Sequence, residues 1–247
     1  MKLYPAIDIL GGNTVRLVKG DYAAKKLYED DPLATARRWA QEGAEQLHMV
    51  DLDGARTGEP VNLEHLRRVV AELGLPVQYG GGLRSLHALE QALAAGAQRV
   101  ILGTAAFTDP ALLRQALDVH GPERVLVSVD VRGSHVATHG WLKTTDAPAR
   151  EAFAGLREQG VSDFVFTDID HDGMLDGANR EEIISVAQAA HEGSVIYSGG
   201  IGSLADLEAL AGLRAKLHLE HLSGVIVGTA LYEGRFTIAE AQGALAG

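Results

Sequence analysis

Short apolar runs rich in β-branched residues alternate along the whole chain with longer segments of helical hydrophobic spacing. The short runs predict strands, and the segments between them predict amphipathic helices. Because each strand is followed by a helix, the strands are expected to run parallel with crossover helices between them. The eight predicted strands are Leu3–Ile9, Gln46–Leu52, Val77–Tyr79, Arg99–Leu102, Val125–Val131, Asp163–Ile169, Val195–Tyr197 and Gly224–Val227.

Polar residues that can cap a helix precede several of these helical segments. In Asp31-Pro32 and Asp109-Pro110 a capping carboxylate stands before a proline that suits the first helical turn. Asn179 with Glu182 has the spacing of a capping box. The remaining cap candidates are Asn62, Ser85 and Ser203.

The second half of the chain repeats motifs of the first half in the same order. Tyr4–Gly11 is echoed by Leu126–Gly133, at an offset of 122 residues. The other matched pairs are His48–Gly54 with Val165–Gly173, Val77–Gly82 with Val195–Gly200, and Val100–Ala105 with Val225–Ala230. An open doubly wound sheet would share the strand–helix alternation, but two four-stranded halves closed into a ring pair every sheet edge. The sequence therefore predicts one α/β domain over residues 1–247, a single (β/α)8 TIM barrel with half-barrels of about 1–122 and 123–247.

Composition narrows the class of function. A formal net charge of −11 argues against a nucleic-acid surface, and the absence of Cys excludes disulfides and thiolate metal sites. No apolar stretch reaches membrane-spanning length, and the first residues lack the apolar run of a signal peptide. No metal-binding histidine spacing occurs on a predicted helix. We expect a cytoplasmic monomer that binds a small molecule, with no metal and no membrane partner.

Two carboxylates stand at the ends of equivalent strands. Asp8 ends the first predicted strand and Asp130 the fifth, so both are expected at the mouth of the barrel, opposite each other. A lone aspartate at such a position can simply cap the following loop. A facing pair can instead divide the work of general acid and general base.

Glycines follow the third, fourth, seventh and eighth strands, and they allow a backbone to approach an anion closely. One predicted phosphate site comprises Gly81, Gly82, Gly103 and Thr104, and the other comprises Gly199, Gly200, Gly228 and Thr229. The alternative is that these glycines only make tight turns. Gly200–Ala205 also fits a relaxed dinucleotide fingerprint, but the matching segment of the first half does not. Further substrate-binding candidates are Arg16, Lys19, His48 and Trp141. The alternatives are that Arg16 and Lys19 lie in an ordinary solvated loop, that His48 has a structural role, and that Trp141 packs against the rim of the barrel.

Motifs across nearly the whole chain resemble the ProFAR isomerases of histidine biosynthesis. The segments are Pro5–Ile9, Val15–Asp21, Val50–Ala55, Gly80–Arg84 and Asp172–Gly177. The resemblance implies an Amadori rearrangement of an aminoaldose that carries two phosphates, without a cofactor. It also implies that Asp8 is the base, that Asp130 is the acid and that Thr167 assists at the reacting sugar. It adds Arg84 to the binding candidates.

Departures from the family pattern lie in the mouth loops. Met174 and Ala178 stand where the family more often has Thr and Pro, and Thr229 replaces a frequent Lys. Three other readings share the same motifs. They are the cyclase subunit of imidazole glycerol phosphate synthase, an isomerase that also accepts phosphoribosylanthranilate, and a non-catalytic phosphosugar-binding barrel. The cyclases usually have Cys-Leu-Asp in the first strand, and the Ala6-Ile7-Asp8 of this chain favours the isomerase.

Overall fold

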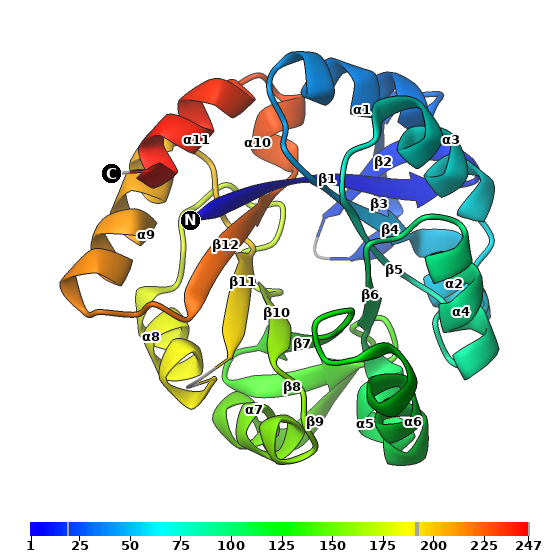
Figure 1. Cartoon of the computed structure of the whole chain (residues 1–247). Helices are drawn as coiled ribbons and strands as arrows, with labels where there is room; N and C mark the ends of the chain where they lie inside the picture. Colours follow the sequence, from blue (N-terminus) through cyan, green and yellow to red (C-terminus); the bar gives the residue numbers. More distant parts are fainter. Residues whose placement is uncertain (19, 191–192, 247) are drawn as a thin grey trace.

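The computed structural model describes residues 1–18, 20–190 and 193–246, and in it eight parallel strands close into a ring (Figure 1). β12 pairs with β1, and β7 pairs with β10, so every strand of the ring is paired on both sides. The predicted eight strands and the single (β/α)8 barrel are confirmed. In order around the ring the strands are β1 (Lys2–Leu10), β4 (Leu47–Asp51), β5 (Val77–Gly80), β6 (Arg99–Leu102), β7 (Val125–Arg132), β10 (Asp163–Asp168), β11 (Ser194–Ser198) and β12 (Leu222–Val227).

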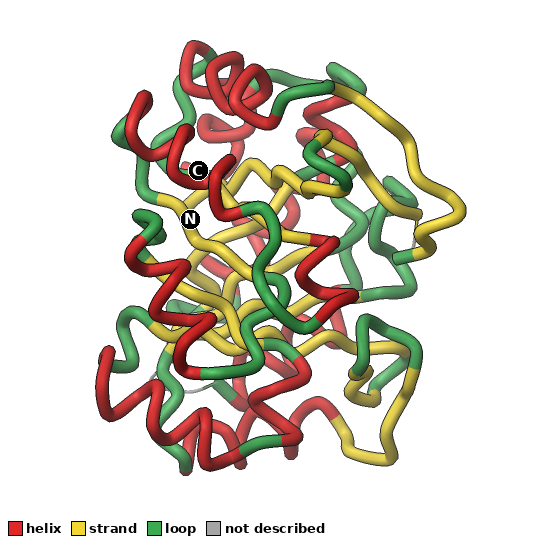
Figure 2. Tube along the Cα trace, turned by 90° about the vertical axis from the view of Figure 1, so that its right-hand side faces the viewer, coloured by secondary structure: helices red, strands yellow, loops and turns green. Residues whose placement is uncertain are grey.

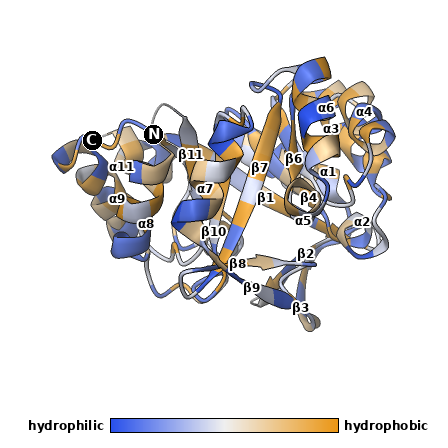
Figure 3. Ribbon diagram, turned by 90° about the horizontal axis from the view of Figure 1, so that it is seen from below, coloured by the Kyte–Doolittle hydropathy of each residue, from blue (hydrophilic) through white to orange (hydrophobic). Residues whose placement is uncertain are grey.

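Helices surround the ring and cover the outer face of the strands (Figure 1). They are α1 (Pro32–Gln41), α3 (Leu63–Leu73), α4 (Leu86–Ala94), α6 (Pro110–His120), α7 (Ala149–Glu158), α8 (Arg180–Ala189), α9 (Leu204–Lys216) and α11 (Ile238–Ala246). Three shorter helices directly follow strands, namely α2 (Leu52–Thr57), α5 (Thr104–Thr108) and α10 (Thr229–Tyr232). Figure 3 shows the mainly hydrophobic β7 within a layer of helices that carry hydrophilic residues. Among the described residues, no helix is long and apolar enough to cross a membrane.

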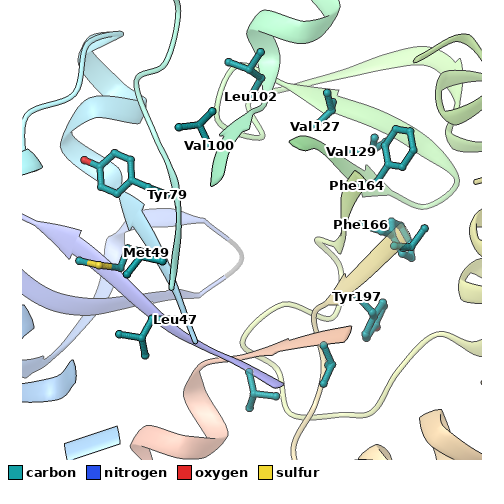
Figure 4. Close-up of a cluster of buried hydrophobic side chains, with 14 of the residues drawn as sticks. Leu47, Met49, Tyr79, Val100, Leu102, Val127, Val129, Phe164, Phe166 and Tyr197 are labelled. Atoms are coloured by element: carbon teal, nitrogen blue, oxygen red, sulfur yellow. The ribbon is translucent and has the colours of Figure 1, made fainter. Parts of the chain in front are cut away.

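The hydrophobic core has two layers, one on each face of the ring. Alternate strand residues point outward against the helices, as the buried side chains of Figure 4 show. The other strand residues fill the inside of the barrel with a smaller buried cluster. That inner cluster consists of Tyr4, Ala6, Ile101, Leu126, Val165, Ile196 and Ile226. Because both strand faces are buried, the strands read as nearly continuous apolar runs.

Most predicted helix caps form, but one prediction was wrong. The side chains of Asp31, Asp109 and Ser85 accept backbone N–H groups at the starts of their helices. Asn179 accepts from Glu182, while both halves of a capping box form at Ser203 with Asp206. The cap at Asn62 is absent because its side-chain amide donates to Asp51 and Asp53 instead.

Two hairpins extend the sheet beyond the ring and were not predicted. The first is formed by β2 (Asn13–Val18) and β3 (Asp21–Glu29), and the second by β8 (His135–Thr138) and β9 (Lys143–Pro148). Figures 2 and 3 show both hairpins on the same side of the barrel, beyond the carboxyl ends of the strands. The exposed polar residues of β3 and β9 lack the buried apolar face that marks a strand in a sequence.

Equivalent contacts recur in the two halves of the barrel. The Gly11 N–H donates to Asp53, and the Gly133 N–H donates to Asp170. These residues occupy matching places in the repeated motifs. In each case the carboxylate after the second strand of a half ties down the loop after the first strand. The division into half-barrels near residue 122 stays a prediction, which these paired contacts support.

Candidate active site

The carboxyl ends of the barrel strands surround a cavity of about 250 Å³. Asp8 and Asp130 both line it, as the barrel geometry predicts for residues at strand ends. The other predicted site residues on its wall are Arg16, His48, Gly81, Gly82, Arg84, Gly103, Thr104, Trp141 and Thr167. Lys19 lies outside the described residues.

A smaller hollow of about 20 Å³ adjoins the main cavity. It contains the four remaining predicted residues, Gly199, Gly200, Gly228 and Thr229. The two cavities share part of their walls, so they form one continuous site. The shared residues are Arg16, Asp172, Ser198 and Ile226.

Asp8 forms an ion pair with a buried arginine. Strand β2 turns back along β1 and pairs Val15 with Asp8, which brings the next residue, Arg16, over the carboxylate. The Arg16 Nη1 donates to Asp8 Oδ2 at 2.6 Å. Burial raises the pKa of Asp8, while the charge of Arg16 opposes the rise. The ion pair therefore favours the ionised carboxylate that a general base requires.

Asp130 is held by neutral donors instead of a cation. The Ser128 hydroxyl donates to one carboxylate oxygen at 2.5 Å, and the Trp141 indole Nε1 donates to the other at 2.7 Å. Burial raises the pKa of Asp130, and hydrogen bonds from Ser128, Trp141 and Thr167 lower it. Two strand-end aspartates at equivalent positions thus have different electrostatic environments.

A third carboxyl group, Asp172, lines both cavities and was missed as a site residue. Its Oδ1 lies 3.7 Å from Arg16 Nη2. Burial raises its pKa to about 6, with Arg16 opposing and the charges of Asp8 and Asp130 adding to the rise. Asp172 lies in a loop four residues beyond β10, so strand periodicity cannot place it at the mouth. Its membership of the Asp172–Gly177 motif was the available signal.

Two short helices begin at the predicted phosphate sites. Helix α5 begins after Gly103 and α10 after Gly228, and neither glycine has a side chain to cap the first N–H groups. Those N–H groups make a helix start suitable for an anion. A Cβ on Gly103 would meet nothing within 4 Å, so the cavity is open at that point. A Cβ on Gly228 would meet the Arg16 guanidinium at 2.5 Å.

The Gly-Gly turns have a packing reason of their own. Gly81 and Gly82 have φ values of 106° and 77°, and Gly199 and Gly200 have 116° and 75°. A Cβ on Gly81 would collide with the Asp51 backbone, and one on Gly200 with the Gly177 carbonyl. The turns and the close backbone packing therefore require glycine at these positions, and phosphate binding by them stays a prediction.

Trp141 lies at the tip of the second hairpin and reaches into the cavity. Its ring packs so closely on Gly20 that any side chain there would collide with it. The neighbouring His139 N–H donates to the Thr104 hydroxyl at 2.8 Å, which attaches the hairpin to the start of α5. The indole is bonded to Asp130, so it is part of the site and does more than pack on the rim.

Among the residues that sequence reasoning missed, Tyr22, Ser128 and Ser198 also line the main cavity. Tyr22 belongs to the unpredicted β3, and its hydroxyl donates to the Leu52 carbonyl at 3.0 Å. Ser128 lies two residues before Asp130 on β7, where alternation directs both side chains to the same face. Strand alternation was therefore enough to find Ser128 once Asp130 had been placed.

The sequence of the whole chain is similar to that of known proteins. The model of the family described as "Histidine biosynthesis protein" matches residues 2–237. The chain belongs to this family. A protein of Parasynechococcus marenigrum (strain WH8102) is 47% identical over 248 residues, with 100% of this chain and 94% of the relative covered. A protein of Alkaliphilus metalliredigens (strain QYMF) is 44% identical over 243 residues, covering 98% and 99%. Both bear the name 1-(5-phosphoribosyl)-5-((5-phosphoribosylamino)methylideneamino)imidazole-4-carboxamide isomerase.

Proposed function

We propose that this protein is an intramolecular aldose–ketose isomerase of histidine biosynthesis that converts the aminoaldose ProFAR to the corresponding aminoketose. ProFAR is the substrate in the names of the similar proteins. The observation that carries the proposal is that Asp8, Asp130 and Asp172 face one cavity that lies between two helix starts suited to phosphate. That layout suits proton transfer on a sugar held at both anionic ends.

The rearrangement needs one proton donor and one proton acceptor. An acid protonates the ribose ring oxygen, the C1–O bond breaks, and the nitrogen lone pair forms a Schiff base at C1. A base then removes the proton from C2 to give an enolamine. Transfer of a proton to C1 and loss of the hydroxyl proton at C2 produce the ketose. Each positioned proton transfer contributes about 10²–10⁴-fold in rate.

Asp8 suits the role of the base because Arg16 favours its ionised form. The acid must carry a proton near neutral pH. The resemblance gives that role to Asp130, whose pKa is raised by burial, although hydrogen bonds from three donors oppose the rise. Asp172, with a pKa of about 6, is better suited to hold the proton. We therefore propose Asp172 as the proton donor and Asp130, with Thr167, as a hydrogen-bonding group at the reacting sugar.

The two phosphates of the substrate are proposed to bind at the starts of α5 and α10. Thr104 and Thr229 are the first residues of these helices and add a hydroxyl beside the N–H groups. Arg16 serves the α10 end, because its guanidinium lies over Gly228. Its Nε is buried and has no hydrogen-bond partner among the residues that the structure describes. A bound phosphate would supply that partner.

A spectroscopic assay of the purified protein tests the proposed function. We expect turnover of ProFAR with no added metal or cofactor. A separate assay with phosphoribosylanthranilate decides whether the same site also serves that smaller substrate. Lack of turnover of ProFAR would contradict the proposal, and ammonia-dependent cyclisation of the ketose would indicate the cyclase instead.

We further propose that the enzyme acts as a monomer in the cytoplasm. Every strand of the ring is paired within one chain, so the barrel closes without a second copy. Light scattering at the concentrations used for the assay is expected to give the mass of one 247-residue chain. Cell fractionation is expected to recover the protein in the cytoplasmic fraction.

A further inference from the structure

Three polar side chains inside the first half of the barrel are linked by hydrogen bonds, and they are called the polar triad below. His48, Gln78 and Arg99 are register neighbours on the consecutive strands β4, β5 and β6. The Gln78 Nε2 lies 2.9 Å from His48 Nδ1, and Arg99 Nη2 donates to Gln78 Oε1 at 2.9 Å. Gln78 is 3% exposed. Only His48 of the three lines the cavity, so Gln78 and Arg99 can affect a substrate only through His48.

The hydrogen-bond donors and acceptors of the polar triad allow only one arrangement of protons on it. A guanidinium has donors and no acceptor, so the Gln78 group that faces Arg99 must be the carbonyl oxygen. The Gln78 amide NH₂ then faces His48 and donates to Nδ1. Since a neutral imidazole carries one proton, that proton must be on Nε2.

We propose that Gln78 and Arg99 are positioning residues that hold His48 as a neutral imidazole with its proton on Nε2. In that state His48 presents a fixed hydrogen-bond donor to a substrate oxygen in the cavity. The kinetic consequence rests on the isomerase activity proposed above, whereas the protonation state of His48 does not.

Further contacts hold the guanidinium of Arg99 in place. Its Nη2 also donates to the Tyr4 hydroxyl at 2.8 Å, and its Nη1 lies 4.0 Å from Asp163 Oδ1. The guanidinium is therefore not free to turn away from Gln78. Because Arg99 is fixed, its hydrogen bond orients the Gln78 amide, and the amide in turn orients the His48 ring.

The other half of the barrel has no counterpart of the polar triad among its described residues. Val165 and Ile196 occupy the positions that match His48 and Gln78, and they are register neighbours on β10 and β11. Both belong to the apolar cluster inside the barrel. A polar triad in one half only is not needed to close the barrel, which points to a role at the site.

The charges around His48 also oppose a second proton on the ring. Burial, together with the positive charges of Arg16 on β2 and Arg99 on β6, lowers the pKa of His48 to about 3. The imidazole is thus neutral throughout the range in which a barrel enzyme of this kind is assayed.

Nitrogen NMR of the imidazole in the free enzyme, with His48 assigned by its substitution, tests the protonation state directly. We expect the wild-type signal of an Nε2–H tautomer, unchanged between pH 5 and 9. We expect Gln78→Met, which removes the donor at similar size, to give a mixture of tautomers. Gln78→Glu replaces the donor by an acceptor and should move a proton to Nδ1. A wild-type Nδ1–H tautomer, or titration of His48 near pH 6.5, would overturn the proposal.

Steady-state kinetics supplies the second readout. Loss of one oriented hydrogen bond should lower kcat/KM for ProFAR about tenfold in Gln78→Met and in Arg99→Met. Gln98→Glu is the matched control, because Gln98 precedes Arg99 in the chain and its side chain is exposed at the surface. Unchanged kinetics in both Met variants with a changed tautomer would reject the positioning role. Inactivity of the wild type with an Nε2–H signal would reject only the isomerase activity.

Discussion

Asp8 and Asp130 occupy equivalent strand ends, and their immediate partners separate their chemistry. The sequence predicted the pair because each ends a strand in a repeated motif. It could not assign their roles, because the partners come from elements that the sequence pattern does not reveal. Arg16 reaches Asp8 from β2, and Trp141 reaches Asp130 from the second hairpin.

Replacement of Asp8 by Asn removes the proposed base at nearly constant shape. We expect Asp8→Asn to lose at least 10²-fold in kcat for ProFAR, since proton abstraction from C2 would have no acceptor. Titration calorimetry should show that ProFAR still binds. Asp118→Asn, an exposed change on α6, is the control and should keep full activity. Full turnover by Asp8→Asn would remove the base from the mechanism.

Asp172 makes the rate depend on pH. Its pKa is raised to about 6, so the protonated fraction falls tenfold for each pH unit above that value. We expect kcat/KM of the wild type to fall with this slope above pH 6. Asp172→Asn should be at least 10²-fold slower and should lose the fall. An Asp172→Asn enzyme with the wild-type profile would return the acid role to Asp130.

At the scale of elements, the ring strands were predictable and the mouth hairpins were not. Burial on both faces makes each ring strand an apolar run, which a sequence displays directly. Strands β3 and β9 are mostly exposed and polar, so their pairing depends on neighbours rather than on a pattern of their own. Asp172 lies in the irregular loop after β10, where no strand or helix period applies.

Two matched tyrosines allow a test of a buried hydrogen bond. The Tyr79 hydroxyl donates to Asp51 at 2.9 Å, whereas the Tyr197 hydroxyl is buried with no acceptor among the described residues. Tyr79→Phe should lower the free energy of unfolding by about 1.5–3 kcal/mol, the range for a bond to a charged group. Tyr197→Phe should change it by less than about 1 kcal/mol. Urea denaturation measures both, and equal losses would contradict the assignment.

The start of α5 can be tested with a single methyl group. A Cβ on Gly103 meets no protein atom within 4 Å, so Gly103→Ala should fold with an unchanged melting temperature. The methyl group would occupy space where the proposed phosphate lies. We expect KM for ProFAR to rise about tenfold, with a smaller effect on kcat. An unchanged KM would exclude phosphate binding at this helix.

At the scale of the whole molecule, the repetition of motifs predicted the closed barrel. Matched strands in the same order favoured a ring over an open sheet, and the pairing of β12 with β1 and of β7 with β10 closes it. The same repetition predicted that both carboxylates open on one cavity. What repetition cannot predict is the difference between the halves, such as the polar triad of His48, Gln78 and Arg99.

The hydrogen bond between Trp141 and Asp130 makes the fluorescence of Trp141 a reporter of ligand binding. The chain has two tryptophans, and Trp39 is 1% exposed and does not line the cavity. A sugar that binds Asp130 enters the cavity beside the indole, so ligand occupancy should alter the emission of Trp141. We expect Trp39→Phe to keep the fluorescence change on adding ProFAR and Trp141→Phe to abolish it. The reverse pattern would mean that the Trp141 indole does not respond when ligand enters.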